Sequence, residues 1–231
     1  MDHDVLMVRA LGIDAAGKNW VAVASDLRAY AAPTLLGLLE VADADGTVEV
    51  VGIDMPIGLP DGADPRLADV QARQVVGPRW PSVFMTPPRT VLAASTYETA
   101  SLEARRVMGK GISQQAWALR HRILEVDTVV RSVHRRIFEV HPEVSFRTLA
   151  GRHLLAAKST WAGLEERRGL LAAEGFVLAA DLGWPGQVAG PDDVLDAAVA
   201  CWTAQRVAAG MAVAYPDPPE QLDGIAASIQ A

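Results

Sequence analysis

The sequence has little cysteine and no long uninterrupted apolar run. Cys201 is the single cysteine among 231 residues, which excludes a disulfide framework and a cysteine-based zinc site. The most apolar stretch, residues 194–214, contains Gln205 and Arg206. The first residues lack the basic start and apolar core of a secretory signal. We therefore expect a cytoplasmic protein that does not insert into a membrane.

Two catalytic signatures are also lacking. No Gly-x-Ser-x-Gly motif occurs, and Cys201 lies in an apolar helical context, so the sequence gives little support for a Ser or Cys nucleophile. Residues 12–19 fit the spacing of a phosphate-binding loop, except that Asn19 replaces the final Ser or Thr. However, residues 20–24 are typical of a strand, whereas such a loop leads into a helix. We predict a hairpin turn here, and an actin-like phosphotransferase is the least favoured function.

Positive charge is scarce overall but concentrated in one region. The net charge is −7, yet residues 61–135 hold eleven Lys or Arg against seven Asp or Glu, which leaves −11 for the remainder. The basic residues either keep exposed helices soluble or form an anion-binding surface, and both interpretations stay open. On the second interpretation, the predicted substrate-binding residues are Arg73, Arg79, Arg89 and Lys110.

The order of predicted elements indicates an α/β fold. Half of the residues are apolar, so residues 1–231 suffice for one domain with its own core. We predict strands over residues 8–14, 20–24, 48–54 and 137–141. We predict helices over residues 34–41, 64–77, 95–109 and 160–173, a long helix from 113, and one over 191–209. This order implies a mixed sheet covered by helices on both faces, with residues 61–135 as a mainly helical insertion.

Acidic residues stand at the ends of predicted strands and at the start of the last long helix. Asp14 and Asp54 end apolar strands, and Glu139 lies in a third strand. Asp193 and Asp196 lie three residues apart at the helix start. Sites in open α/β sheets form beyond the carboxyl ends of the strands, where these carboxylates would converge and repel one another. Mg²⁺ or Mn²⁺ would relieve that repulsion, because these ions prefer oxygen ligands.

Each acid also has a structural interpretation. Asp14 would cap the turn that follows it, and Asp193 would cap its helix and leave Asp196 as the better ligand. Glu139 and Glu143 cannot be told apart from the sequence. For His141, a hydrogen-bonded structural role is favoured over metal ligation.

Several motifs together resemble the DUF429 family, whose members are predicted RNase H-like nucleases. These motifs span most of the chain: Gly12-Ile13-Asp14 with Gly17 and Trp20, residues 52–59, Ala72-Arg73 with Gly77 and Arg79, residues 82–89, residues 109–115, residues 139–143 and residues 192–197. Ala16 before Gly17 departs from the family pattern but leaves Asp14 in place.

The resemblance implies an RNase H-like fold and a RuvC-like acidic site that cleaves phosphodiester bonds with two metal ions. In such a site Asp14 and Asp54 would hold the metals, Asp193 and Asp196 would complete the site, and Glu139 would be a supporting catalytic ligand. The substrate would be a nucleic acid or another phosphodiester. A binding protein that keeps the fold without catalysis is the main alternative function.

Overall fold

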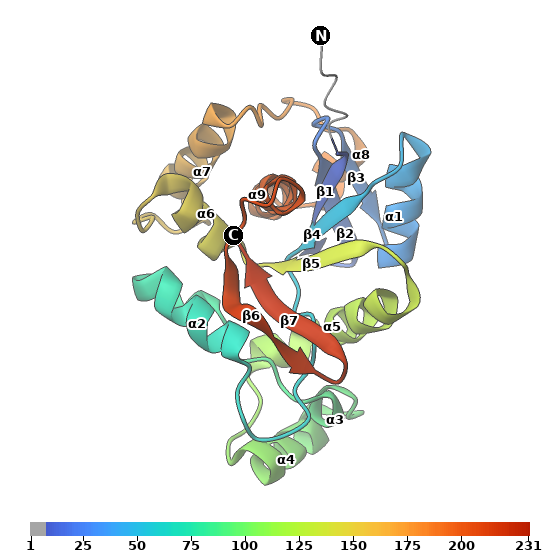
Figure 1. Ribbon diagram of the computed structural model, residues 1–231, viewed down its shortest axis with the longest axis vertical. Helices are drawn as coiled ribbons and strands as arrows, with labels where there is room; N and C mark the ends of the chain where they lie inside the picture. The colour runs from blue at the N-terminus through green and yellow to red at the C-terminus, as the bar shows by residue number, and fades with distance from the viewer. Residues whose placement is uncertain (1–7) are drawn as a thin grey trace.

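The computed structural model of the protein describes residues 8–231, whose strands form a single mixed sheet (Figure 1). Its order is β3-β2-β1-β4-β5-β7-β6. The strands are β1 (Ala10–Ala16), β2 (Asn19–Ala24), β3 (Ala29–Ala32), β4 (Val50–Ile53), β5 (Arg136–Val140), β6 (Ala214–Leu222) and β7 (Ile225–Gln230). β2 is antiparallel to both of its neighbours, β1 and β3, whereas β4, β5 and β7 run parallel to β1, and the edge strand β6 is antiparallel to β7. The predicted α/β class with a mixed sheet is confirmed, and the sheet is consistent with an RNase H-like fold.

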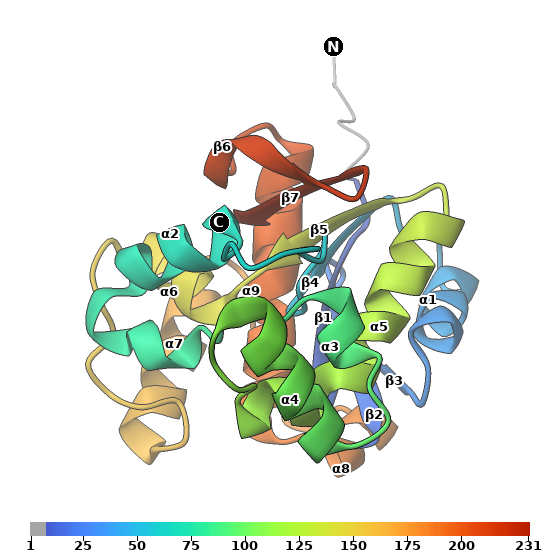
Figure 2. The same cartoon turned by 90° about the horizontal axis from the view of Figure 1, so that it is seen from below.

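Helices cover both faces of the sheet (Figures 1 and 2). The helices are α1 (Leu35–Ala44), α2 (Leu67–Val76), η1 (Gly77–Ser82), α3 (Arg89–Leu92), α4 (Tyr97–Met108), α5 (Gln114–Ser132), α6 (Pro142–Ala150), α7 (Trp161–Ala173), α8 (Trp184–Val188) and α9 (Pro191–Ala208). One core includes Ile13 and Ile53 of the sheet, with Leu38 of α1 and Ile123 of α5. The opposite core joins the other face of the sheet to α6, α7 and α9. The sheet is therefore buried on both sides, as its apolar strands require.

The predicted hairpin at residues 12–19 is present. β1 and β2 pair from Leu11↔Ala24 to Ala16↔Asn19, and Gly17 occupies a turn position with a φ of +56°. The turn leads into a strand and not into a helix. The geometry that lets a helix N-terminus hold phosphate is thus absent from these described residues.

Several elements differ from the predictions, and β3, α3 and α8 were not predicted. No element was predicted beyond residue 209, but residues 214–230 form the β6–β7 hairpin, in which the proline-rich β6 is tolerated because it is an edge strand. No helix was predicted directly after the strand at 137–141, but Pro142 is the first residue of α6. The helix predicted from residue 64 begins at Leu67, since Arg66 is extended and its side chain lies in the core.

The helical segment of the chain joins β4 to β5. Helices α2 to α5 and η1 all lie between these two strands in the sequence. The division into one domain with an insertion at about 61–135 stays a prediction. Within residues 8–231, every helix is too short or too polar to cross a lipid bilayer.

Candidate metal centre

The tripeptide Gly-Ile-Asp occurs within β1 and at the end of its neighbour β4, and is aligned between the two strands; β1 continues to Ala16 and does not end at Asp14 as predicted. In the parallel pair β1 and β4, Gly12 lies opposite Gly52 and Ile13 opposite Ile53. The Asp54 N–H donates to the carbonyl of Ile13 at 2.9 Å, which continues the pairing to the acidic residues. Because side chains alternate along a strand, each aspartate faces the same side of the sheet as the glycine two residues before it.

The two glycines allow α9 to lie directly on the sheet. A Cβ atom at Gly12 would lie 2.0 Å from the carbonyl oxygen of Ala197, and one at Gly52 would lie 2.5 Å from that of Ala200. Neither distance is possible for a side chain, so both positions require glycine if the helix is to keep this approach. The same contact carries Asp196, one residue before Ala197, to the ends of β1 and β4.

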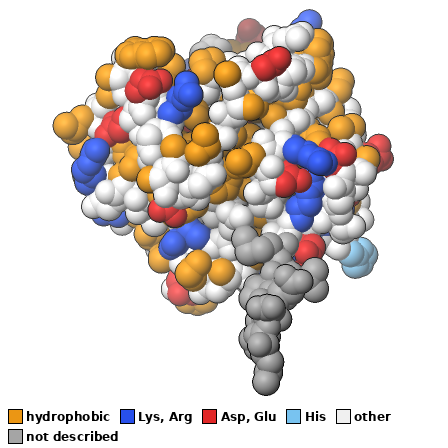
Figure 3. Space-filling model, turned by 90° about the horizontal axis from the view of Figure 1, so that it is seen from above, with side chains coloured by type: hydrophobic (Ala, Val, Ile, Leu, Met, Phe, Trp, Pro, Cys, Tyr) orange, Lys and Arg blue, Asp and Glu red, His pale blue; other side chains and the backbone are white. Residues whose placement is uncertain are grey.

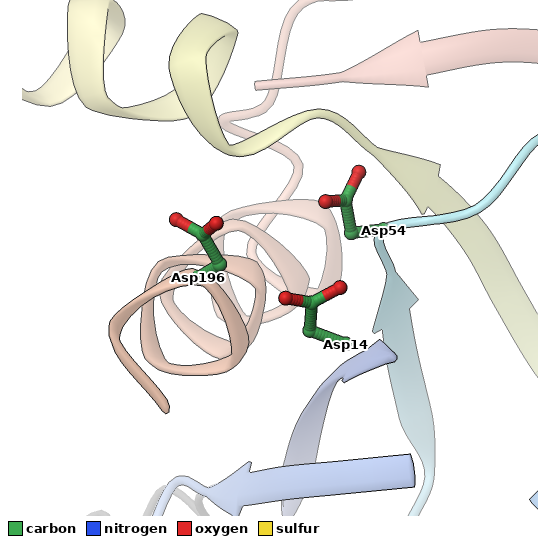
Figure 4. A group of neighbouring side chains, drawn as sticks. All are labelled: Asp14, Asp54 and Asp196. Atoms are coloured by element: carbon green, nitrogen blue, oxygen red, sulfur yellow. The ribbon is translucent and has the colours of Figure 1, made fainter. Parts of the chain in front are cut away.

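The result is a group of three carboxylates, from Asp14, Asp54 and Asp196 (Figure 4). One oxygen from each lies within 4.8 Å of the others, and in the figure the carboxylates turn toward a common space. Asp14 and Asp196 are buried and Asp54 is partly buried. Three carboxylates this close repel one another unless protons or a cation neutralise them.

This repulsion and the burial shift the acidity of the group. Burial raises the pKa of Asp14 well above its usual value, and the charges of Asp54 and Asp196 raise it further. Burial likewise raises the pKa of Asp54 and that of Asp196 to about 7, against the opposing effect of Lys158. The ionised group is therefore costly without a bound cation.

Lys158, which no sequence motif singled out, reaches this group from the loop between α6 and α7. Its Nζ donates to Asp196 Oδ2 at 2.5 Å and lies 3.9 Å from Asp192 Oδ2. Burial would lower the pKa of Lys158, but the Asp196 carboxylate raises it above its usual value. Lys158 therefore remains a cation beside the acidic group.

A cavity of about 520 Å³ opens over the three carboxylates. Its lining includes the carboxylates, Lys158 and Arg79, together with backbone and side chains of η1 and of the segment that begins α6. A volume of this size accommodates a ligand in addition to a metal ion.

Glu139, predicted as a catalytic and supporting metal ligand, lies outside the three-carboxylate group. In the parallel pairing of β4 and β5, it lies opposite Ile53 and therefore faces the other side of the sheet from Asp54. Its Oε2 accepts hydrogen bonds from Arg66 Nη2 at 2.5 Å and from the Ile57 N–H at 2.8 Å. Burial raises the pKa of Glu139 to about 7, and Arg66 opposes that shift. A shift of the β4–β5 pairing by one residue would place Glu139 on the same side of the sheet as the three carboxylates.

Three further polar residues line the cavity next to the group. Glu143 is bound by Arg167, whose Nη2 donates to Oε1 at 2.6 Å. Asp193 accepts from the Gly190 N–H at 3.1 Å, as expected of a capping residue. His141 Nε2 lies 3.4 Å from the carbonyl of Ser82, and burial lowers the pKa of its imidazole.

The four basic residues predicted to bind substrate lie in different surroundings. Arg79 lines the cavity, but its guanidinium donates to the carbonyls of Leu154 and Leu155. Arg73 donates to the Val83 carbonyl and stacks on Trp80, and Arg89 pairs with Asp127 and Asp223. Lys110 is exposed at the end of α4.

Basic side chains are also dispersed elsewhere. On the face in Figure 3, Lys and Arg side chains of described residues lie in small groups beside acidic ones, without a continuous basic stripe.

A family described as protein of unknown function (DUF429) matches residues 12–221. The chain belongs to this DUF429 family. The match contains all three carboxylates and Lys158, as well as the two glycines that support α9. No curated protein and no solved structure matches the chain.

Proposed function

We propose that this DUF429 protein is a divalent-metal-dependent hydrolase that cleaves phosphodiester bonds, with nucleic acid as the first class of substrate to test. The observation that carries the proposal is the convergence of Asp14, Asp54 and Asp196, from two strands and one helix, on a space only 4.8 Å across. The fold brings these acids together through two glycines that accept no side chain. Burial of carboxylates that repel one another does not favour folding, and it is typical of a site that is arranged to bind a ligand.

The donor set suits Mg²⁺ or Mn²⁺. These ions prefer carboxylate oxygens and retain coordination positions for water and phosphate oxygens. Within residues 8–231, Cys201 and the imidazole of His141 lie outside the three-carboxylate group, so these residues offer softer metals no Cys or His ligand there. When bound, such an ion activates water and stabilises the charge of a departing oxygen.

The protein itself would position the substrate in the cavity above the carboxylates. Lys158 and Arg79 supply positive charge to its lining, which favours a phosphate group. Asp193 caps α9 and Glu143 is paired with Arg167. In our proposal these two residues shape the cavity and do not bind the ion. Glu139 is likewise assigned a structural role.

The test is a cleavage screen of purified protein with Mg²⁺ or Mn²⁺. Substrates are single-stranded and duplex DNA, RNA, a four-way junction and a small activated phosphodiester. We expect cleavage that stops with a chelator and falls by about 10²–10³-fold in Asp14→Asn, because removal of one group that stabilises charge at the reacting atoms typically costs that much. The matched control is Asp217→Asn, which changes an exposed residue of β6.

A different set of results would contradict catalysis. Metal binding without cleavage of any substrate would favour the non-catalytic binding protein. Cleavage that persists in Asp14→Asn would identify a contaminant or a different site.

A further inference from the structure

Lys158 differs from the other cations around the cavity in its direct contact with the carboxylate group. Its side chain is 41% exposed, whereas the Asp196 side chain that it contacts is 2% exposed. The ammonium therefore enters a buried acidic site from the solvent side. Such a placement of a charged group is costly unless the charge itself is needed there.

The loop that carries Lys158 is built to hold it. Arg79 Nη2 donates to the Leu155 carbonyl at 2.7 Å, and Thr160 Oγ1 donates to the Ala157 carbonyl at 2.8 Å. A Cβ atom at Gly163 would lie 1.9 Å from the Ala157 carbonyl oxygen, so α7 must have glycine here to pack against the loop. These contacts fix the backbone on the N-terminal side of Lys158 and direct its side chain to one place.

The contact of Lys158 with Asp196 also limits the number of metal ions. Asp14, Asp54 and Asp196 carry −3 when ionised, Asp193 at the edge of the cavity adds −1, and Lys158 supplies +1. The Lys158 ammonium occupies Asp196 Oδ2 at 2.5 Å, so this oxygen is not available to a second ion, and the ammonium repels a divalent ion placed beside it. Glu143 adds nothing to the balance, because Arg167 already pairs with it.

We propose that Lys158 is a permanent member of the metal centre and replaces a second metal ion, so that the centre holds one divalent cation. This inference rests on the proposed function and revises the two ions that the resemblance implied. Lys158 acts here as a positioning and charge-supplying residue beside the ion.

The experiment counts bound Mn²⁺ by isothermal titration calorimetry and by electron paramagnetic resonance, at about pH 8, above the pKa of about 7 of Asp54 and Asp196. The variants are Lys158→Gln, which removes the charge, and Lys158→Arg, which retains it. Lys18→Gln, at an exposed turn, is the control for the same change in net charge. Circular dichroism checks that each variant is folded.

We expect one Mn²⁺ in the wild-type protein, in Lys158→Arg and in Lys18→Gln, and two in Lys158→Gln. The first ion should bind Lys158→Gln on the order of tenfold more tightly or better, because a neighbouring positive charge no longer repels it. The count in the wild-type protein tests the inference even if Lys158→Gln does not fold.

Two results would overturn the inference and leave the proposed function standing. Two ions in the wild-type protein would show that Lys158 replaces none. One ion in both the wild-type protein and Lys158→Gln would show that Lys158 does not limit the number. If the wild-type protein binds no Mn²⁺, the proposed function fails and this inference fails with it.

Discussion

Two groups of buried acidic residues lie near the same end of the sheet, and they differ in how their charge is balanced. Glu139 and Glu143 are each bound by an arginine that is itself fully buried, Arg66 and Arg167 respectively. In contrast, three aspartates share Lys158. Arg66 also pairs with Asp69, so the first group has two buried arginines for three acids and is close to balanced, while the second has a single, partly exposed lysine for three acids and a larger excess of negative charge.

This difference separates structural from functional acids. A buried carboxylate that is paired and hydrogen-bonded contributes to one specific fold, and loss of its partner is costly. A group with unbalanced charge does nothing for folding and is retained where a ligand completes it. The balance of charge, more than burial or position at a strand end, therefore identifies Asp14, Asp54 and Asp196 as the candidate site.

The largest expected effect comes from breaking the balanced group. Arg66→Met would leave Glu139 and Asp69 buried without their cation, and we expect a loss of about 3–5 kcal/mol in the free energy of unfolding. Denaturant unfolding measures this loss. Arg106→Met removes an exposed partner of Glu103 and should leave the free energy of unfolding nearly unchanged, because water screens an exposed ion pair. Similar values for the two variants would contradict the structural role of the balanced group.

A smaller effect is expected when α9 is moved away from the sheet. Gly12→Ala places a methyl group against the backbone of Ala197 and Cys201, which should cost about 1–3 kcal/mol or more and displace Asp196 from the other carboxylates. Stabilisation by Mn²⁺ in thermal unfolding should then weaken.

The matched control is Gly169→Ala, in an open position on α7, which should stabilise the protein by about 0.5–1 kcal/mol. A Gly12→Ala protein with unchanged stability and Mn²⁺ response would show that the close approach of α9 is not required.

A further expected effect is a pH dependence of stability that arises from the unbalanced group. The pKa values of Asp54 and Asp196 are raised in the folded protein, to about 7, by burial. The stability that their protonated forms provide is present below the unfolded pKa of about 4 and is lost as the pH rises through about 7. The Tm of the metal-free protein should therefore fall between about pH 5 and pH 8, by about 2–4 °C for each kcal/mol lost.

Asp14→Asn should reduce this fall, and saturating Mn²⁺ should oppose it. A Tm that rises over the same range in the metal-free protein would mean that the carboxylates do not repel one another as described.

Much of the candidate site could be predicted from the sequence because its signals are local. An apolar strand followed by Asp, repeated as Gly-Ile-Asp, indicates two acids at one edge of a sheet. The helix that begins near Asp193 supplied a third acid. Asp193 caps this helix, as expected, and Asp196 lies with Asp14 and Asp54.

The remaining features depend on contacts between distant parts of the chain. The strand register that turns Glu139 away from the group cannot be read from the residues around it. Arg66 and Arg167 lie 73 and 24 residues from the acids they bind, and Lys158 lies 38 residues from Asp196. The β6–β7 hairpin was missed because proline normally argues against a strand, and only its edge position explains it.

The most direct test of the central claim is anomalous X-ray diffraction from crystals of the wild-type protein grown with Mn²⁺. We predict an anomalous peak bound by the carboxylates of Asp14, Asp54 and Asp196, with Glu139 and Glu143 still paired to their arginines. A peak at the glutamates, or no peak at the three aspartates when Mn²⁺ is in excess, would contradict the account.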